Sequence, residues 1–374
     1  MAKTAPPLFR ADHVGSFLRP QRLLDARAKK ESGEISAEAL REIEDECITE
    51  VVKKQESVGL KGITDGEFRR TFFHVDFLEQ LDGVEVTYGE FQSKFRKDDG
   101  TEVGFRPPTI HVAGKIEHAR SIQGADFDYL KSQVSKTAKV TIPSPSMLHF
   151  RGGRAAIDEA IYPDLEQFYK DLGDAYAEEA ADLAARGCRY LQLDDTNLAY
   201  LCDPKIRAST AERGDDPDDL TRAYCRLMNH ALASRHDDMT LSVHLCRGNF
   251  KSAWVAEGSY EPVAEILLNE MDVDSFFLEY DDERSGGFAP LRFLPKGKAV
   301  VLGLMSSKKR EVETKDEVMR RIEEAAVYAP IEQLALSHQC GFSSTSHGND
   351  LSEDDQWRKL ERMVEITEAV WGKV

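Results

Sequence analysis

Short apolar runs of β type alternate with long amphipathic or charged helical runs, and eight such pairs can be followed from end to end. The β-type runs are residues 11–15, 62–65, 139–142, 189–193, 240–244, 275–278, 298–303 and 333–337. The helical stretches include residues 36–58, 164–186, 216–236, 262–271, 315–328 and 353–371. Such alternation is typical of a parallel sheet covered by helices, and eight pairs in 374 residues predict a single (β/α)8 TIM barrel.

A doubly wound open sheet is the rival α/β fold. That fold binds nucleotides at a glycine-rich turn after its first strand, and no such turn follows residues 11–15. The rhythm breaks at residues 82–117, where extended runs flank Asp98-Asp99-Gly100. We therefore expect one domain over residues 1–374, with an antiparallel β-hairpin excursion between strands two and three that is an inert insertion, a lid or an oligomer contact.

The charge balance narrows the classes of partner. A net charge of -18 argues against nucleic acid and anionic membranes, because phosphate groups bind basic surfaces. No run approaches the roughly 18 apolar residues of a membrane span, and the first residues lack the apolar core of a signal peptide. We expect a cytoplasmic protein that acts on small molecules, with its oligomeric state, a homo-oligomer included, left open.

Polar side chains gather where the predicted strands end. The residues of interest at these ends are Ser16, Glu67, Asp194, Asp195, His244, Cys246, Glu279, Lys308, His338 and Cys340. The active site of a (β/α)8 barrel lies at the carboxyl ends of its strands. The barrel prediction therefore makes one rim of the sheet the candidate active site.

A metal site is the most specific prediction for this rim. His244 and Cys246 lie two residues apart, so an extended strand end points both to one side. With Glu279 and Cys340 they form a donor set whose two sulfurs favour Zn²⁺ over Mg²⁺. Buried cysteines are more often small hydrophobic residues, and we expect this of the remaining four, Cys47, Cys188, Cys202 and Cys225.

The acidic residues have alternative explanations. Asp194 and Asp195 are equally suited to capping the helix that follows them. Glu67 precedes two arginines, Arg69 and Arg70, and could form an ion pair with either. If these carboxylates face the mouth of the barrel instead, they suit a substrate that carries an amino group.

Several of these motifs resemble those of cobalamin-independent methionine synthase and its shorter single-barrel relatives. The matching segments are Gly15-Ser16-Phe17, Asp65-Gly66-Glu67, Gln192-Leu193-Asp194-Asp195, His244-Leu245-Cys246-Arg247-Gly248-Asn249-Phe250 and Cys340-Gly341. The similarity runs from about residue 13 to residue 372. The chain is thereby identified as a short member of that family, similar to its carboxyl-terminal catalytic barrel.

The resemblance implies a zinc-dependent methyltransferase similar to 5-methyltetrahydropteroyltriglutamate-homocysteine methyltransferase. It implies that Zn²⁺ is held by His244, Cys246, Glu279 and Cys340, the same four residues as above. It further implies that homocysteine sulfur binds the zinc and that the amino group meets Glu67 and Asp194. The substrate carboxylate would lie near Ser16, and Asp195 is a weaker candidate for substrate binding.

Three departures from the family leave the methyl donor open. The sequence has no room for the family's second barrel, so the donor is a methyl-folate, a corrinoid carried by a partner protein, or a small methylated metabolite. Residues 303–308 read Gly-Leu-Met-Ser-Ser-Lys where the family has a proton-transferring histidine, which leaves Lys308, His338 or the substrate as the acid. Arg151 and Arg154 have no family counterpart and could bind an anionic group of the donor or acceptor.

Two other functions stay open. The related epoxyalkane:coenzyme M transferases add a thiol to an epoxide, and Arg151 and Arg154 would suit their sulfonate substrate, whereas Glu67 and Asp194 favour an amino-acid thiol. The third possible function is that of a zinc-binding barrel module without enzymatic activity. Structural zinc sites usually draw their ligands from one short stretch, so ligands spread over about a hundred residues speak against it.

Overall fold

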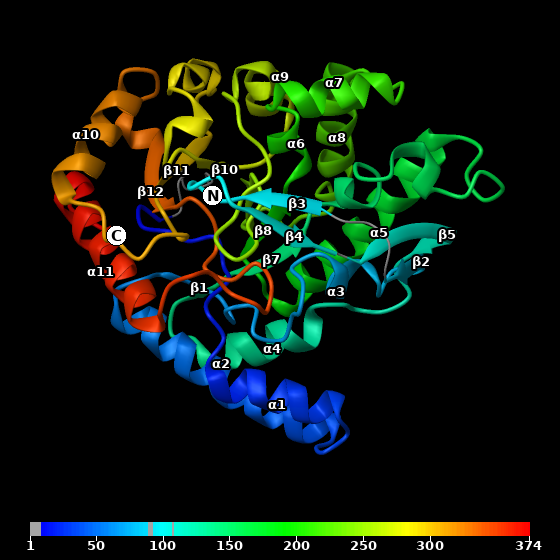
Figure 1. Ribbon diagram of the computed structural model, residues 1–374, viewed down its shortest axis with the longest axis horizontal. Helices are drawn as coiled ribbons and strands as arrows, with labels where there is room; N and C mark the ends of the chain where they lie inside the picture. The colour runs from blue at the N-terminus through cyan, green and yellow to red at the C-terminus, as the bar shows by residue number, and fades with distance from the viewer. Residues whose placement is uncertain (1–8, 89–92, 107) are drawn as a thin grey trace.

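Parallel strands surrounded by helices dominate the computed structural model, which describes residues 9–88, 93–106 and 108–374 (Figure 1). Six strands form one sheet in chain order: β7 (Val140–Pro143), β8 (Tyr190–Asp195), β9 (Thr240–Leu245), β10 (Ser275–Glu279), β11 (Ala299–Met305) and β12 (Leu334–His338). Every neighbouring pair in this sheet is parallel. The predicted α/β class with parallel strands is confirmed.

Two further segments link the outer strands of this sheet. β1 (Gly62–Ile63) pairs in parallel with β6 (Thr137–Ala138), and only Lys139 separates β6 from β7. At the other edge Ala11 forms a parallel bridge with Leu336 of β12. The ring of His13 then contacts the carbonyl of Gly62 at 2.9 Å. Strand β12 is thus connected to β7 through residues 11–13, β1 and β6.

The prediction of a full first strand at residues 11–15 is wrong in extent, since only the bridge at Ala11 forms there. The backbone N–H of His13 donates to the side chain of Asp12 at 2.8 Å, so it is not available to a neighbouring strand. Gly15 has a φ of 137°, which an extended strand does not accommodate. The segment is therefore held by side-chain contacts rather than by a ladder.

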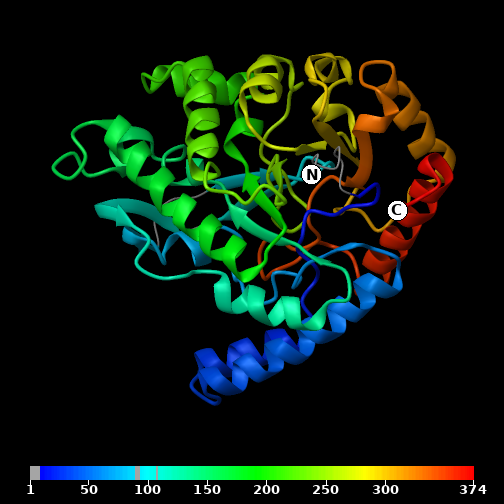
Figure 2. The same cartoon turned by 180° about the vertical axis from the view of Figure 1, so that it is seen from behind.

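The helices form an outer layer around the strands, as the view from behind also shows (Figure 2). They are α1 (Gln21–Glu31), α2 (Ala37–Ser57), α3 (Val75–Leu78), α4 (Gly124–Gln133), α5 (Leu165–Arg186), α6 (Asn197–Tyr200), α7 (Pro204–Glu212), α8 (Pro217–Ala231), α9 (Glu261–Glu270), α10 (Lys315–Ala326) and α11 (Glu353–Trp371). Short 3-10 turns are η1 (Pro145–Leu148), η2 (Gly153–Ala156), η3 (Glu283–Ser285), η4 (Ala289–Phe293) and η5 (Ile331–Gln333). Ser36 and Asp216 are the N-caps of α2 and α8, since their side chains accept backbone N–H groups of the first turn.

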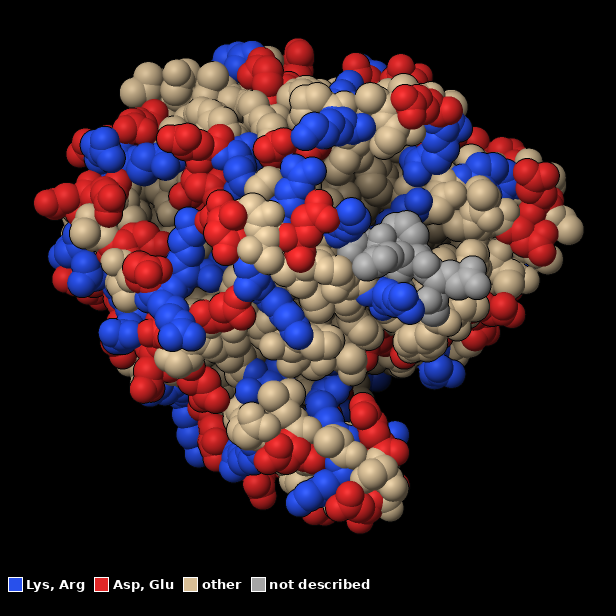
Figure 3. Space-filling view, in the orientation of Figure 1, with Lys and Arg blue, Asp and Glu red and all other residues tan. Residues whose placement is uncertain are grey.

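The surface carries many charges of both signs. On the face seen in Figure 3, acidic and basic side chains are interspersed rather than separated into fields. Within the described ranges, no helix has the length and apolar character required to cross a membrane.

The predicted excursion is antiparallel and consists of two nested pairs of strands. β2 (Asp82–Thr87) pairs with β5 (Thr109–Glu117), and β3 (Ser93–Arg96) pairs with β4 (Glu102–Phe105). The turn of the inner hairpin is closed by a 2.9 Å hydrogen bond from the N–H of Lys97 to the carbonyl of Thr101. The expected boundaries at residues 82 and 117 therefore coincide with the outer strand pair.

The inner hairpin packs on loops that follow the strands of the sheet (Figure 1). The ring of Phe105 stacks on Phe250 at 4.1 Å, and Phe95 lies 5.6 Å from the same ring. At the turn, Asp98 pairs with Lys309 at 2.7 Å and accepts a hydrogen bond from the indole N–H of Trp254. Since these partners follow β9 and β11, the hairpin covers part of the rim where the strands end.

Replacement of Phe95 with alanine is expected to detach this hairpin. Phe95 is buried in the aromatic cluster, and loss of such a side chain costs about 3 kcal/mol of unfolding free energy. Limited proteolysis should therefore cut residues 93–105 faster in Phe95→Ala than in the wild type. Tyr88→Ala, at a side chain that is 74% exposed, is the control and should behave like the wild type. Equal cleavage of both variants would show that the cluster does not hold the hairpin.

Candidate metal centre and active site

The register of the parallel strands places three acidic or metal-binding side chains on the inner side of the sheet. Phe277 belongs to a small apolar cluster with Val14, Val301 and Ala335, which faces inward. His244 lies beside Phe277 in register, and Asp194 lies beside His244. In-register neighbours share a face, and Glu279, two residues after Phe277, shares it too.

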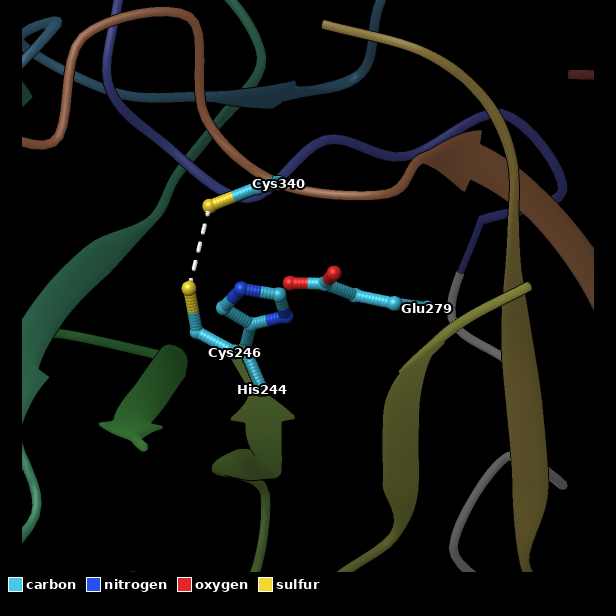
Figure 4. Close-up of side chains that lie close together, drawn as sticks. All are labelled: His244, Cys246, Glu279 and Cys340. Carbon is cyan, nitrogen blue, oxygen red and sulfur yellow. Dashed lines mark hydrogen bonds between the residues drawn. The ribbon is translucent and has the colours of Figure 1, made fainter. Parts of the chain in front are cut away.

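The four predicted metal ligands meet at the carboxyl end of these strands. One candidate ligand atom from each of His244, Cys246, Glu279 and Cys340 lies within 4.8 Å of the other three, and all four residues are buried. The two sulfurs are 3.4 Å apart, and the imidazole and carboxylate lie beside them (Figure 4). Residues that are distant in the sequence, from β9, β10 and the loop after β12, thus converge on one point.

The cluster contains polar atoms that lack partners. Neither ring nitrogen of His244 has a hydrogen bond to the described residues, and the same is true of Glu279 Oε2. The other carboxylate oxygen, Oε1, accepts the backbone N–H of Arg247 at 2.9 Å. Buried polar atoms without partners are rare, and a cation at this point would take one ring nitrogen of His244 and Glu279 Oε2 as ligands. The donor set of two sulfurs, an imidazole and one carboxylate oxygen fits Zn²⁺.

The hydrogen bond between the two thiols of the cluster shifts their pKa values in opposite directions. The pKa of Cys340 falls well below its ordinary value, because Cys246 donates a hydrogen bond to its sulfur and His244 lies nearby. The same hydrogen bond and burial raise the pKa of Cys246. Burial also raises the pKa of Glu279. The lowered pKa of Cys340 favours its thiolate, which is the form that binds metal.

Glu67 and Asp194 form a second buried pair on the same rim. Glu67 Oε1 accepts a hydrogen bond from Thr141 at 3.1 Å, whereas Oε2 has no hydrogen bond to the described residues and lies 3.8 Å from the guanidinium of Arg70. Asp194 accepts a hydrogen bond from Gln192 at 2.7 Å, and burial together with the charge of Glu67 raises its pKa to about 7. Glu67 also has a φ of 59°, a strained conformation that occurs most often at functional sites.

The ion-pair alternative for Glu67 is only partly realised. Arg70 lies 3.8 Å from Glu67, but its short hydrogen bonds go to Gln123 and Thr141. Arg69 points away and pairs with the acidic residues Glu44, Asp45 and Asp126. One carboxylate oxygen of Glu67 therefore stays available.

Asp195 lies on the opposite side of β8 from Asp194. It accepts hydrogen bonds from the hydroxyls of Ser144 and Ser146 and from the backbone N–H of Leu198 at the start of α6. This is the capping role that the sequence left open. The side chain of Asp195 has none of the metal ligands among these partners, although its backbone carbonyl accepts the N–H of Cys246 at 2.7 Å.

Ser16 lies against the loop that carries Cys340. Its hydroxyl accepts the N–H of Ser343 at 3.4 Å, and a side chain at Gly341 would come within 2.0 Å of it. The structure therefore brings Ser16 to the rim beside the metal cluster, as expected.

Of the two candidate acids, only Lys308 reaches the site. Its buried ammonium donates to the carbonyl of Gly248 at 3.0 Å, and its charge helps to lower the pKa of Cys340. His338 faces the helices instead, and the centre of its ring lies 4.9 Å from that of Phe342. Burial lowers the pKa of His338, and the positive charge of Lys359 lowers it further. We assign no role in the reaction to His338.

Of the two arginines in the loop after β7, one stabilises the loop and the other lines a pocket. The guanidinium of Arg154 donates to the carbonyls of Ile157 and Tyr162, which fixes the loop. Arg151 lines a pocket of about 190 Å³ together with His74 and the apolar side chains of Ile110, Met147 and Leu148. His74 is buried and neither of its ring nitrogens has a hydrogen-bond partner in the described part of the chain.

Sequence reasoning missed His74 and the buried Arg247. His74 follows the Asp65-Gly66-Glu67 motif without any spacing that marks it. Arg247 lies inside the His244–Phe250 motif, directly after Cys246, and this place next to a predicted metal ligand is the signal that could have identified it.

Comparisons with known proteins identify the family. Residues 9–369 match the family model described as "Cobalamin-independent synthase, Catalytic domain". The uncharacterized protein YxjH of Bacillus subtilis is 45% identical over 97% of this chain and 95% of its own length. A methionine synthase of Saccharolobus solfataricus is 26% identical over 97% of this chain and 95% of its own length.

A solved structure gives the same result. The crystal structure of a candidate vitamin-B12-independent methionine synthase from Listeria monocytogenes is 40% identical, with a TM-score of 0.79, and covers 99% of this chain and 100% of that one. The chain therefore belongs to the family of the cobalamin-independent synthase catalytic domain and is a methyltransferase of the methionine-synthase type.

Proposed function

We propose that the protein transfers a methyl group to the sulfur of homocysteine and thereby forms methionine, using Zn²⁺ held by His244, Cys246, Glu279 and Cys340. The observation that carries the proposal is the buried cluster of these four side chains, whose candidate ligand atoms lie within 4.8 Å of one another. The similarity to proteins named methionine synthase supports homocysteine as the acceptor.

The four candidate ligands have different roles in binding the metal. The two cysteines supply soft sulfur donors from separate loops. The N–H of Arg247 holds Glu279 Oε1, which leaves Oε2 to bind the metal. When bound there, Zn²⁺ acts as a Lewis acid that lowers the pKa of an incoming thiol, so that the sulfur can react as a soft nucleophile.

Glu67 and Asp194 bind the ammonium group of homocysteine. Burial and mutual repulsion destabilise the negative charges of these two carboxylates. A bound ammonium group would stabilise both charges. Ser16, against the loop that carries Cys340, binds the carboxylate through its hydroxyl. With its ammonium and carboxylate groups held in this way, the substrate presents the sulfur at its other end in line with the methyl group of the donor.

The transfer itself is a displacement at carbon. The sulfur attacks the methyl carbon, and as the new bond forms, the bond from the methyl group to the donor breaks and its electron pair passes to the donor. Lys308 supplies a proton to the leaving group when the donor atom is a nitrogen. Arg151 and His74 form the donor pocket, in which the arginine pairs with an anionic group of the donor.

The donor can be identified directly. Zinc-loaded protein is incubated with homocysteine and, in parallel, a methyl-folate, a methyl-corrinoid, a small methylated metabolite or an epoxide, and the thiol products are analysed by mass spectrometry. Methionine is expected with one of these donors. An adduct with an epoxide but no methionine would favour the epoxide-opening alternative, which the methionine synthases above do not support. Failure to form any product would contradict the proposal.

A further inference from the structure

Arg19 is a buried arginine that binds four backbone carbonyls, and it is only 6% exposed. One terminal nitrogen, Nη1, donates to the carbonyl of Phe17 at 3.3 Å and to that of Ser343. The other terminal nitrogen, Nη2, donates to the carbonyls of Glu67 at 2.7 Å and Arg70 at 3.1 Å. The planar fork of a guanidinium group allows one side chain to connect these separate segments, which an ammonium group with its single nitrogen cannot do.

The three segments that Arg19 connects all carry residues of the proposed homocysteine site. Phe17 directly follows Ser16, the proposed ligand of the carboxylate. Ser343 lies three residues after the metal ligand Cys340. Glu67 is itself a proposed ligand of the ammonium group. A single guanidinium group thus holds together the loops that bind the two ends of the amino-acid group and the metal.

The backbone of Glu67 is held on both sides. Its φ of 59° lies in the left-handed region, which residues other than glycine rarely adopt. The N–H of Glu67 donates to the side chain of Asp65 at 2.8 Å, and its carbonyl accepts the 2.7 Å hydrogen bond of Arg19. These two bonds fix the peptide groups before and after Glu67. They thereby set the direction of its side chain, whose carboxylate accepts the hydroxyl of Thr141 at 3.1 Å.

We propose that Arg19 is a positioning residue for substrate binding, because its guanidinium fork holds Glu67 in the conformation that presents the carboxylate to the substrate ammonium group. The inference rests on the proposed function, since it takes Glu67 as a ligand of that ammonium group. Arg19 contacts the backbone rather than the substrate and so acts through Glu67. Without Arg19, the left-handed backbone of Glu67 can relax, and the carboxylate then moves from its place beside Asp194.

The metal ligand loop has further anchors that do not involve Arg19. The carbonyl of Gly341, next to Cys340, accepts hydrogen bonds from the side chains of Asn249 and Ser307, each at 3.0 Å. Replacement of Arg19 should therefore weaken recognition of the ammonium group and preserve zinc binding. This difference separates a positioning role from a general role in stability.

The test compares homocysteine with 4-mercaptobutanoate, which has the same thiol and carboxylate but lacks the amino group. Dissociation constants are measured by calorimetry for zinc-loaded wild type, Arg19→Gln and Arg19→Lys, after the metal content is determined. The preference for homocysteine should fall by about ten-fold in both variants, the effect of one hydrogen bond to a charged group. Arg19→Lys keeps the positive charge without the planar fork, and it supplies a folded variant if Arg19→Gln does not fold.

Arg27→Gln is the matched control. Arg27 binds the carbonyl of Phe68, the residue after Glu67, at 2.6 Å, and none of its hydrogen bonds within the described ranges reaches Glu67. This variant should keep the preference of the wild type. Glu67→Gln should lose part of the preference, and addition of Arg19→Gln to it should cause no further loss, because both changes act on one carboxylate.

A wild-type preference in Arg19→Lys would overturn the proposal, because the positive charge alone would then suffice. A further ten-fold loss on addition of Arg19→Gln to Glu67→Gln would also contradict it. Equal losses in Arg27→Gln, or loss of zinc from the Arg19 variants, would show a general disturbance of the loops and would count against positioning of Glu67. Failure of the proposed function gives a different result: the wild type itself would bind 4-mercaptobutanoate as tightly as homocysteine.

Discussion

Cys246→Ser and Cys340→Ser should each lose zinc and methyl-transfer activity together. A serine hydroxyl is a poor zinc ligand at neutral pH, whereas each cysteine supplies one of the two soft donors of the cluster. Even loss of a residue that only supports a ligand weakens metal binding by about 10–100-fold, so loss of a ligand should exceed about 100-fold. Metal content by mass spectrometry and activity at saturating zinc are the two measurements.

The matched control for these variants is Cys188→Ser. Cys188 is also fully buried, but its sulfur contacts the carbonyl of Tyr190 and not the cluster. This variant should keep the zinc content of the wild type. If Cys340→Ser retained both full zinc content and full activity, the assignment of the metal site would be wrong.

Asp194→Asn should weaken homocysteine binding and remove its pH dependence. Loss of one partner of a buried charge pair costs about 2–5 kcal/mol, so kcat/KM should fall by at least about 30-fold. Because burial and Glu67 raise the pKa of Asp194 to about 7, the carboxyl group is neutral below that pH and charged above it. Homocysteine affinity of the wild type should therefore rise as the pH increases through 7, and the variant should lack this step.

Asp195→Asn is the control for this prediction. Asp195 caps α6 from the other side of β8, so its replacement should lower the free energy of unfolding by about 1 kcal/mol and keep the pH step. Isothermal titration between pH 6 and 8 distinguishes the two variants. A pH step that survives in Asp194→Asn but disappears in Asp195→Asn would reverse the two assignments.

The strand order and the metal ligands were predictable from the sequence because both follow from local patterns. Seven of the eight β-type runs contain strands, and the rule that parallel strands end at one rim brought His244, Cys246, Glu279 and Cys340 together. The face of the sheet to which each side chain points was less well predicted. Asp195 and His338 lie at strand ends, but alternation along β8 and β12 turns them toward the helices.

Other features depend on contacts between distant segments and have no local signal. The first strand is reduced to a bridge because the side chain of Asp12 takes the N–H of His13. The burial of Arg247 depends on Tyr260, at the start of α9. The pocket at Arg151 needs β5 of the excursion to meet the turns after β7.

X-ray absorption at the zinc edge tests the central claim that the cluster activates a thiol. Zinc-loaded protein should show a shell of two sulfurs with nitrogen and oxygen donors, as the four ligands require. Addition of homocysteine should raise the number of sulfurs bound to zinc to three. With methionine in place of homocysteine, the sulfur scattering should be weaker than in the homocysteine sample. A shell that does not change when homocysteine is added at saturating concentration would contradict the account.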